Sequence, residues 1–139
     1  MGVFLRSWAA GTIHKNRELA DHGPYAITRH PLYIGSFLMF TGFATIIGDD
    51  ENIWFVLIIF FLFYFPAIRR EEQNLHQKFK GEWSDYIERT SIFFPKKIPV
   101  NILSTWSLKR WLNNREYRAF AVSLIALTIL ELIHEFQVL

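Results

Sequence analysis

Cysteine is absent from this chain of 139 residues, and its absence excludes disulfide bonds, thiolate catalysis and cysteine-ligated metal sites. Several other signatures of chemistry are missing as well. No two histidines have the spacing of a helical zinc site, and the chain contains neither a Gly-x-Gly-x-x-Gly loop nor a P-loop. No serine lies in a Gly-x-Ser-x-Gly nucleophile elbow. The sequence therefore gives no support to a metal site, a hydrolase elbow or a soluble nucleotide-binding fold.

Charged residues are also few, at 20% of the chain, and their formal net charge is only +2. No basic stripe stands apart from the apolar blocks, so we expect no nucleic-acid partner. Hydrophobic residues make up 51% of the chain and include 14 Phe, 5 Trp and 5 Tyr, concentrated in blocks. The length suits one domain, residues 1–139. The block pattern indicates an integral membrane protein whose partner is the lipid bilayer.

Three apolar runs account for most of these blocks. The first covers Leu32 to Gly48 and the second covers Ile53 to Ile68, with the polar tetrad Asp49–Asn52 between them. Runs of 17 and 16 residues are short for a bilayer, which needs roughly 20, so we expect a tilted hairpin in a thinned layer. The third run, Ala119 to Ile133, is expected to form a C-terminal membrane helix. The fold class expected is therefore all-α.

The basic residues predict how the hairpin is oriented. Four of the 15 Lys and Arg residues precede it, none lies in its bend, and the remaining eleven lie between Arg69 and Arg118. The positive-inside rule therefore places both hairpin ends in the cytoplasm, and we expect a prokaryotic cell (inner) membrane. Residues Arg69 to Thr90 are predicted to form an amphipathic cytoplasmic helix, which Gly81 could divide.

The hairpin predicts one chemically rich corner. Pro31 suits the first position of a helix and pushes His30 toward an extended backbone. With the midpoint of the bend between residues 50 and 51, His30 faces Glu71 and Tyr33 faces Ile68. Taken alone, Arg29 and Glu71 could simply mark the membrane boundary, and His30 could simply donate a hydrogen bond to a backbone carbonyl. Together they form a corner with imidazole, phenol, guanidinium and carboxylate groups beside an apolar layer, which suits a polar cofactor meeting a lipidic substrate.

These motifs together resemble the isoprenylcysteine carboxyl methyltransferase family, which is related to the membrane phospholipid N-methyltransferases. The resemblance rests on Gly23-Pro24-Tyr25, Arg29-His30-Pro31-x-Tyr33 and Glu71-Glu72-x-x-Leu75, with Phe79 and Tyr86. It covers roughly Arg17 to Pro95 and, in bacterial relatives, also the helix with Arg115-Glu116-Tyr117-Arg118. The resemblance implies a multi-spanning enzyme that holds S-adenosylmethionine at the cytoplasmic membrane face and methylates a lipidic or amphipathic small molecule.

The resemblance also implies a set of site residues. The cofactor contacts would come from Arg17, Glu18, Leu19, Ala20, Tyr25, His30, Pro31, Leu32, Tyr33 and Glu71. From the position of the charged groups we further expect Arg70 or Glu72 to orient the acceptor, and we expect no metal site. The oligomeric state stays open, a homo-oligomer included.

Two departures from the family pattern keep rival interpretations open. The isoprenylcysteine branch has an arginine where this chain has Ala67, which places that substrate in doubt. The opening run, Gly2 to Ile13, is too short to cross a bilayer, so the chain could be a truncated form. The rivals are a nicotinamide-dependent membrane reductase of the sterol type and a non-catalytic membrane relative.

Overall fold

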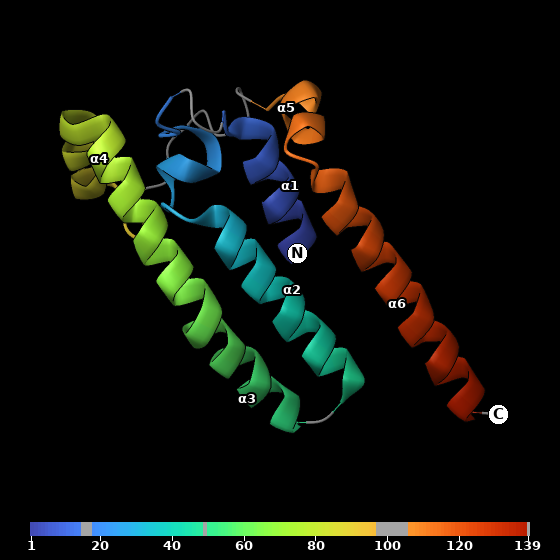
Figure 1. The fold of residues 1–139 in the computed structure, drawn as a ribbon. Helices are drawn as coiled ribbons and strands as arrows, with labels where there is room; N and C mark the ends of the chain where they lie inside the picture. Colours follow the sequence, from blue (N-terminus) through green and yellow to red (C-terminus); the bar gives the residue numbers. More distant parts are fainter. Residues whose placement is uncertain (15–17, 49, 97–105, 139) are drawn as a thin grey trace.

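The computed structural model describes residues 1–14, 18–48, 50–96 and 106–138. Within these ranges the regular structure is helical, apart from one isolated bridge between Thr28 and Ser91. The elements are α1 (Gly2–Thr12), a 3₁₀ turn (Gly23–Ala26), α2 (Pro31–Ile47), α3 (Asp50–Ile59), a π-helical segment (Phe60–Tyr64), α4 (Phe65–Arg89), α5 (Leu108–Asn113) and α6 (Glu116–Val138). The expected all-α class is confirmed (Figure 1).

The predicted hairpin is present, but its bend is shorter than expected. Helix α2 ends at Ile47 and is followed by Gly48, which adopts a left-handed backbone with φ 86°, a conformation that glycine adopts at low cost. Helix α3 already begins at Asp50. The prediction of a four-residue bend was therefore wrong, because acidic residues are favourable in the first turn of a helix, where they meet the positive end of its dipole.

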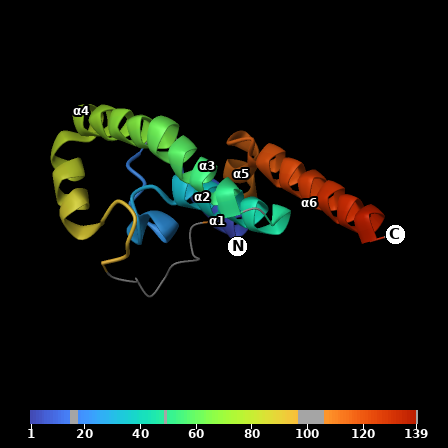
Figure 2. The same ribbon diagram turned by 90° about the horizontal axis from the view of Figure 1, so that it is seen from below.

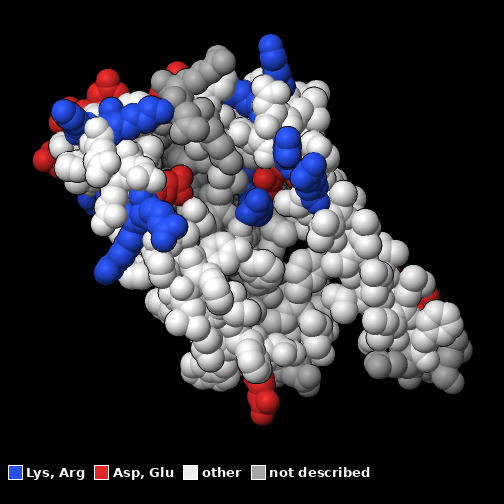
Figure 3. Space-filling view, in the orientation of Figure 1, with Lys and Arg blue, Asp and Glu red and all other residues white. Residues whose placement is uncertain are grey.

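Among the residues that the structure describes, two helical stretches are long and apolar enough to cross a membrane. They are Glu51–Arg89, which joins α3, the π-helical segment and α4, and Glu116–Phe136 in α6. Large apolar side chains such as Trp54 and Phe63, each 68% exposed, cover the outer surface of the hairpin, as expected of a surface that meets lipid. Figure 3 shows the charged side chains gathered at the end of the molecule near α5 and the end of α4, with few over the helices below.

The predicted amphipathic helix over Arg69 to Thr90 is not a separate element. It continues the second arm of the hairpin as α4, and the backbone bends sharply at Lys80 (φ 26°, ψ −98°), next to Gly81. Beyond this bend, Trp83 and Tyr86 are buried, and the end of α4 turns back toward the rest of the molecule (Figure 2).

Hydrogen bonds connect this returning end of α4 to the loop before α2. The hydroxyl of Tyr86 donates to the Tyr25 carbonyl at 2.7 Å, and the backbone N–H of Arg29 donates to the Ser91 carbonyl at 2.9 Å. These bonds hold the loop before α2 against the end of α4 and the residues that follow it, while the Gly23–Ala26 turn of the same loop packs against α1.

Helix α1 packs closely against α2 and is connected by an ion pair to α6. A side chain at Gly35 would collide with Gly2 and Arg6, so small residues permit this close approach. Arg6 forms a two-pronged pair with Glu116 (2.8 and 3.1 Å) and also donates to the Ser36 hydroxyl. One partly buried group of polar contacts therefore connects three helices.

Candidate active site

The basic and acidic groups predicted to meet at the hairpin end do meet there. His30 precedes α2 with a non-helical backbone (φ −127°, ψ 56°) and is buried. Its Nε2 atom lies 3.2 Å from Glu72 Oε1, and Arg29 Nε lies 3.2 Å from the same oxygen. The expected partner was Glu71. Reflection about the bend predicts a level along the hairpin but not a face of the helix. Neighbouring residues of a helix point about 100° apart, and Glu72 is the one that faces His30.

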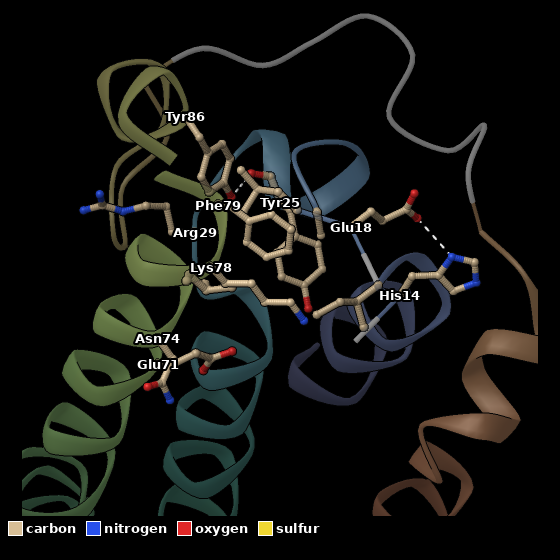
Figure 4. A pocket seen from close by; sticks show the side chains of 13 residues that line it. His14, Glu18, Tyr25, Arg29, Glu71, Asn74, Lys78, Phe79 and Tyr86 are labelled. Carbon is tan, nitrogen blue, oxygen red and sulfur yellow. Dashed lines mark hydrogen bonds and ion pairs between the residues drawn. The ribbon is translucent and has the colours of Figure 1, made fainter. Parts of the chain in front are cut away.

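Glu71 instead faces two adjoining cavities of about 220 Å³ each. The first, called here the Glu18 cavity, is shown in Figure 4 and is lined by Ile13, His14, Glu18, Leu19, Ala20, Tyr25, Arg29, Glu71, Asn74, Leu75, Lys78, Phe79 and Tyr86. The second, called the Tyr33 cavity, is lined by Arg6, Ile13, Tyr25, Arg29, His30, Leu32, Tyr33, Ser36, Tyr64 and Glu71. Glu71 and Tyr25 thus lie on the boundary between the two cavities.

Tyr25 brings a buried hydroxyl to this boundary. The residue is 6% exposed, and its Oη atom has no hydrogen-bond partner within the part of the chain that the structure describes. Burial, reinforced by the nearby Glu71 carboxylate, raises the pKa of Tyr25 well above its ordinary value. The phenol therefore stays protonated and is able to donate a hydrogen bond to a molecule in either cavity.

A third cavity, of about 170 Å³, lies deeper in the hairpin and is called the Phe37 cavity. It is lined by Phe37, Phe40, Val56, Ile59, Phe60 and Tyr64. Tyr64, at the end of the π-helical segment, also lines the Tyr33 cavity, and its ring stacks on Phe60 at 5.6 Å. The site therefore consists of two cavities with both polar and apolar lining residues, followed by an apolar cavity.

Most of the residues named from the sequence lie on these cavities. Glu18, Leu19, Ala20 and Tyr25 line the Glu18 cavity, Tyr25, His30, Leu32 and Tyr33 line the Tyr33 cavity, and Glu71 lines both. Pro31 is buried at the first position of α2. Arg17 lies outside the described residues.

The two residues named as acceptor-orienting groups lie elsewhere. Arg70 is exposed and lines none of the three cavities. Glu72 lines none of them either, because its carboxylate is turned toward Arg29 and His30. The basic side chains that do line the Tyr33 cavity are Arg6 and Arg29.

Sequence reasoning missed several lining residues. Asn74 and Lys78 follow Glu71 by three and seven positions, so helical periodicity alone could have placed them on the same face. Arg6, Ser36 and Tyr64 reach the Tyr33 cavity through tertiary packing, which no local pattern reveals. Among the described residues, no group of three or more His, Cys, Asp or Glu side chains could hold a metal ion.

Comparison with known proteins gives a family match and a few relatives. A family model described as phospholipid methyltransferase matches residues 4–82. The chain is 34% identical over 98 residues to the nickel-cobalt-cadmium resistance protein NccN of Alcaligenes xylosoxydans xylosoxydans, covering 69% of this chain and 46% of that protein. It is 32% identical over 114 residues to the cobalt-zinc-cadmium resistance protein CzcN of Cupriavidus metallidurans, covering 78% and 52%.

A more distant relative has an enzyme name. The chain is 25% identical over 107 residues to the protein-S-isoprenylcysteine O-methyltransferase of Saccharomyces cerevisiae, covering 68% of this chain and 45% of the yeast protein. The chain thus spans about half the length of the curated relatives it matches. No solved structure gives a significant match.

Proposed function

Because the chain belongs to the phospholipid methyltransferase family, we propose that it transfers a methyl group from S-adenosylmethionine to an amphipathic acceptor at the cytoplasmic face of the membrane. The observation that carries this proposal is the position of Glu71, whose carboxylate lies between two adjoining cavities at the polar end of a membrane hairpin. A carboxylate held there suits a cationic ligand next to a lipid-derived one.

The lining of the Glu18 cavity fits the chemistry of S-adenosylmethionine. That molecule has an ammonium group, a carboxylate, ribose hydroxyls and a flat base. The cavity presents the carboxylates of Glu18 and Glu71, the Asn74 amide, the Lys78 ammonium and the ring of Phe79. Each cavity alone is smaller than typical ligand pockets of about 300–1,000 Å³, so the bound cofactor would extend from the Glu18 cavity across the boundary at Tyr25 and Glu71 and share the Tyr33 cavity with the acceptor. The buried Tyr25 hydroxyl adds a donor that lacks a partner within the described residues.

In the proposed reaction the bound cofactor supplies an electrophilic methyl group to a nucleophilic oxygen, nitrogen or sulfur of the acceptor. The chain's own contribution is alignment and the exclusion of water. Glu71 holds the cationic end of the cofactor, and Tyr25 donates a hydrogen bond at the boundary of the two cavities. His30 and Tyr33 form the wall on the acceptor side, where Glu72 holds the imidazole ring in place.

The Phe37 cavity supports an acceptor with an apolar part. It adjoins the Tyr33 cavity at Tyr64, so an acceptor could place its polar head near Arg29 and its apolar part among the aromatic rings. Its volume of about 170 Å³ is close to that of an apolar cavity of about 150 Å³ that binds benzene. We therefore propose that a compact apolar group occupies it.

Filling this cavity tests the acceptor side. Val56→Phe places a ring in the Phe37 cavity, and Val122→Phe, at a position on α6 that is 65% exposed, is the matched control. With tritiated S-adenosylmethionine and a bacterial membrane lipid extract, Val56→Phe should lower methyl incorporation about tenfold, equivalent to about 1.4 kcal/mol, while the control should keep it. Equal incorporation by both variants would exclude the Phe37 cavity as the acceptor site.

Paired titrations of the purified chain test the proposed activity against its rivals. The proposal expects S-adenosylmethionine to bind and NADPH not to bind. Binding of NADPH alone would instead support a reductase, and binding of neither would support a non-catalytic relative.

A further inference from the structure

Helix α5 and its flanking residues hold the end of α1. The last carbonyl groups of a helix lack partners within it and must be satisfied from elsewhere. Four such bonds come from this region: Ser107 N–H to Gly11 O (2.9 Å), Arg110 Nη1 to Thr12 O (2.9 Å), and Asn114 Nδ2 to Ala10 O (2.8 Å) and Ile13 O (3.2 Å). These bonds therefore fix the position of the end of α1, which leads to the segment that begins with His14.

A hydrogen-bond chain continues from α5 into this segment. Arg110 Nε lies 3.1 Å from His14 Nε2, and His14 Nδ1 lies 3.0 Å from Glu18 Oε1. A guanidinium can only donate, so Nε2 must accept and the ring must be neutral. The ring proton is then on Nδ1, from which it is donated to Glu18. The direction of both hydrogen bonds is thereby fixed.

Glu18 is the end of this chain and part of the cavity wall. Figure 4 shows the dashed contact between His14 and Glu18 beside the cavity. The His14 and Glu18 side chains are 39% and 49% exposed, and pairs so accessible to water contribute little to stability. Without the imidazole, the Glu18 carboxylate would be free to rotate into water. The main effect of the contact is therefore to hold the Glu18 carboxylate beside the cavity, not to stabilise the fold.

We propose that Arg110 and His14 are positioning residues, which hold Glu18 as a hydrogen-bond acceptor for an N–H or O–H group of bound S-adenosylmethionine. This inference rests on the proposed function and extends it. The family match ends at residue 82, so the proposal gives the C-terminal segment a part in ligand binding that the matched region does not contain. Arg110 reaches the ligand only through His14 and Glu18.

Substitutions at His14 separate a hydrogen-bond relay from simple packing. In His14→Gln the amide oxygen can accept from Arg110 while the amide nitrogen donates to Glu18, so the relay is preserved. His14→Leu removes both bonds, and Lys109→Gln, at an exposed position on α5, is the control. We expect calorimetry with S-adenosylhomocysteine to show about three- to tenfold weaker binding for His14→Leu, the cost of one hydrogen bond. His14→Gln and Lys109→Gln should remain within about twofold of wild type, and all variants should unfold at similar temperatures.

A spectroscopic measurement tests the relay without any ligand. In ¹⁵N-histidine-labelled protein, the signals lost in His14→Gln belong to His14, and they should report a neutral ring protonated at Nδ1. A ring protonated at Nε2, or wild-type affinity in His14→Leu, would overturn the positioning role while leaving the proposed function intact. Failure of the wild-type chain to bind S-adenosylhomocysteine would instead refute the proposed function, and the inference with it.

Discussion

The Nε2 atom of His30 lies 3.2 Å from a carboxylate oxygen of Glu72, although the two residues are 42 positions apart in the chain. Arg29 pairs with the same oxygen. Adjacent residues of a helix point about 100° apart, so Glu71 faces the cavities while Glu72 faces the loop before α2. The two neighbouring carboxylates therefore have different roles: Glu71 is available to a ligand, and Glu72 holds Arg29 and His30 in place.

Glu72→Gln should destabilise the protein because it leaves the Arg29 charge without its partner. The Glu72 side chain is only 23% exposed and that of Arg29 only 13%, so we expect the free energy of unfolding to fall by about 1–3 kcal/mol. Thermal unfolding in detergent, followed by circular dichroism, measures the change. Glu82→Gln, at an exposed position on the same helix, is the control, and an equal effect of the two substitutions would contradict the role given to Glu72.

The contact between Arg6 and Glu116 should behave as a largely buried ion pair, because the Glu116 side chain is only 7% exposed and that of Arg6 23%. Removing one partner of such a pair costs about 3–5 kcal/mol, whereas replacing both by apolar residues is often nearly neutral. We therefore expect Arg6→Met and Glu116→Met each to lower the unfolding temperature strongly, and the double variant to recover most of the loss. Additive losses in the double variant would show that the pair does not connect α1 to α6 energetically.

Tyr25→Phe should change the pH dependence of stability. Because the pKa of Tyr25 is raised in the folded protein, the folded state retains a proton that the unfolded state releases near pH 10. Stability is therefore fully present below that pH and decreases as the pH rises toward the folded pKa. Unfolding temperatures between about pH 8 and 11 should fall more steeply for wild type than for Tyr25→Phe. Parallel curves would contradict a protonated, buried phenol.

The helices and the corner between them could be predicted from the sequence because apolar runs, Pro31 and the placement of charge act locally. Three details could not. The bend was predicted too long because Asp50 was assigned to a turn, although an acidic residue also suits the start of a helix. Which of the neighbouring carboxylates Glu71 and Glu72 faces His30 depends on the rotation of α4 about its axis, and the Arg6–Glu116 contact depends on packing between α1 and α6. Tertiary structure decides both.

The cofactor site must be established before the methyl acceptor can be identified. That site depends on Glu71. Its carboxylate lines both 220 Å³ cavities, whereas Glu88 is exposed farther along the same helix and provides a matched control. Both substitutions, Glu71→Gln and Glu88→Gln, remove one negative charge from α4.

The most direct measurement is calorimetric titration of S-adenosylmethionine into the wild-type chain, Glu71→Gln and Glu88→Gln, with unfolding temperatures recorded in parallel. We predict that wild type and Glu88→Gln bind the cofactor and that Glu71→Gln is folded but does not bind it. Unchanged affinity in a folded Glu71→Gln protein, or no binding by wild type, would contradict the account.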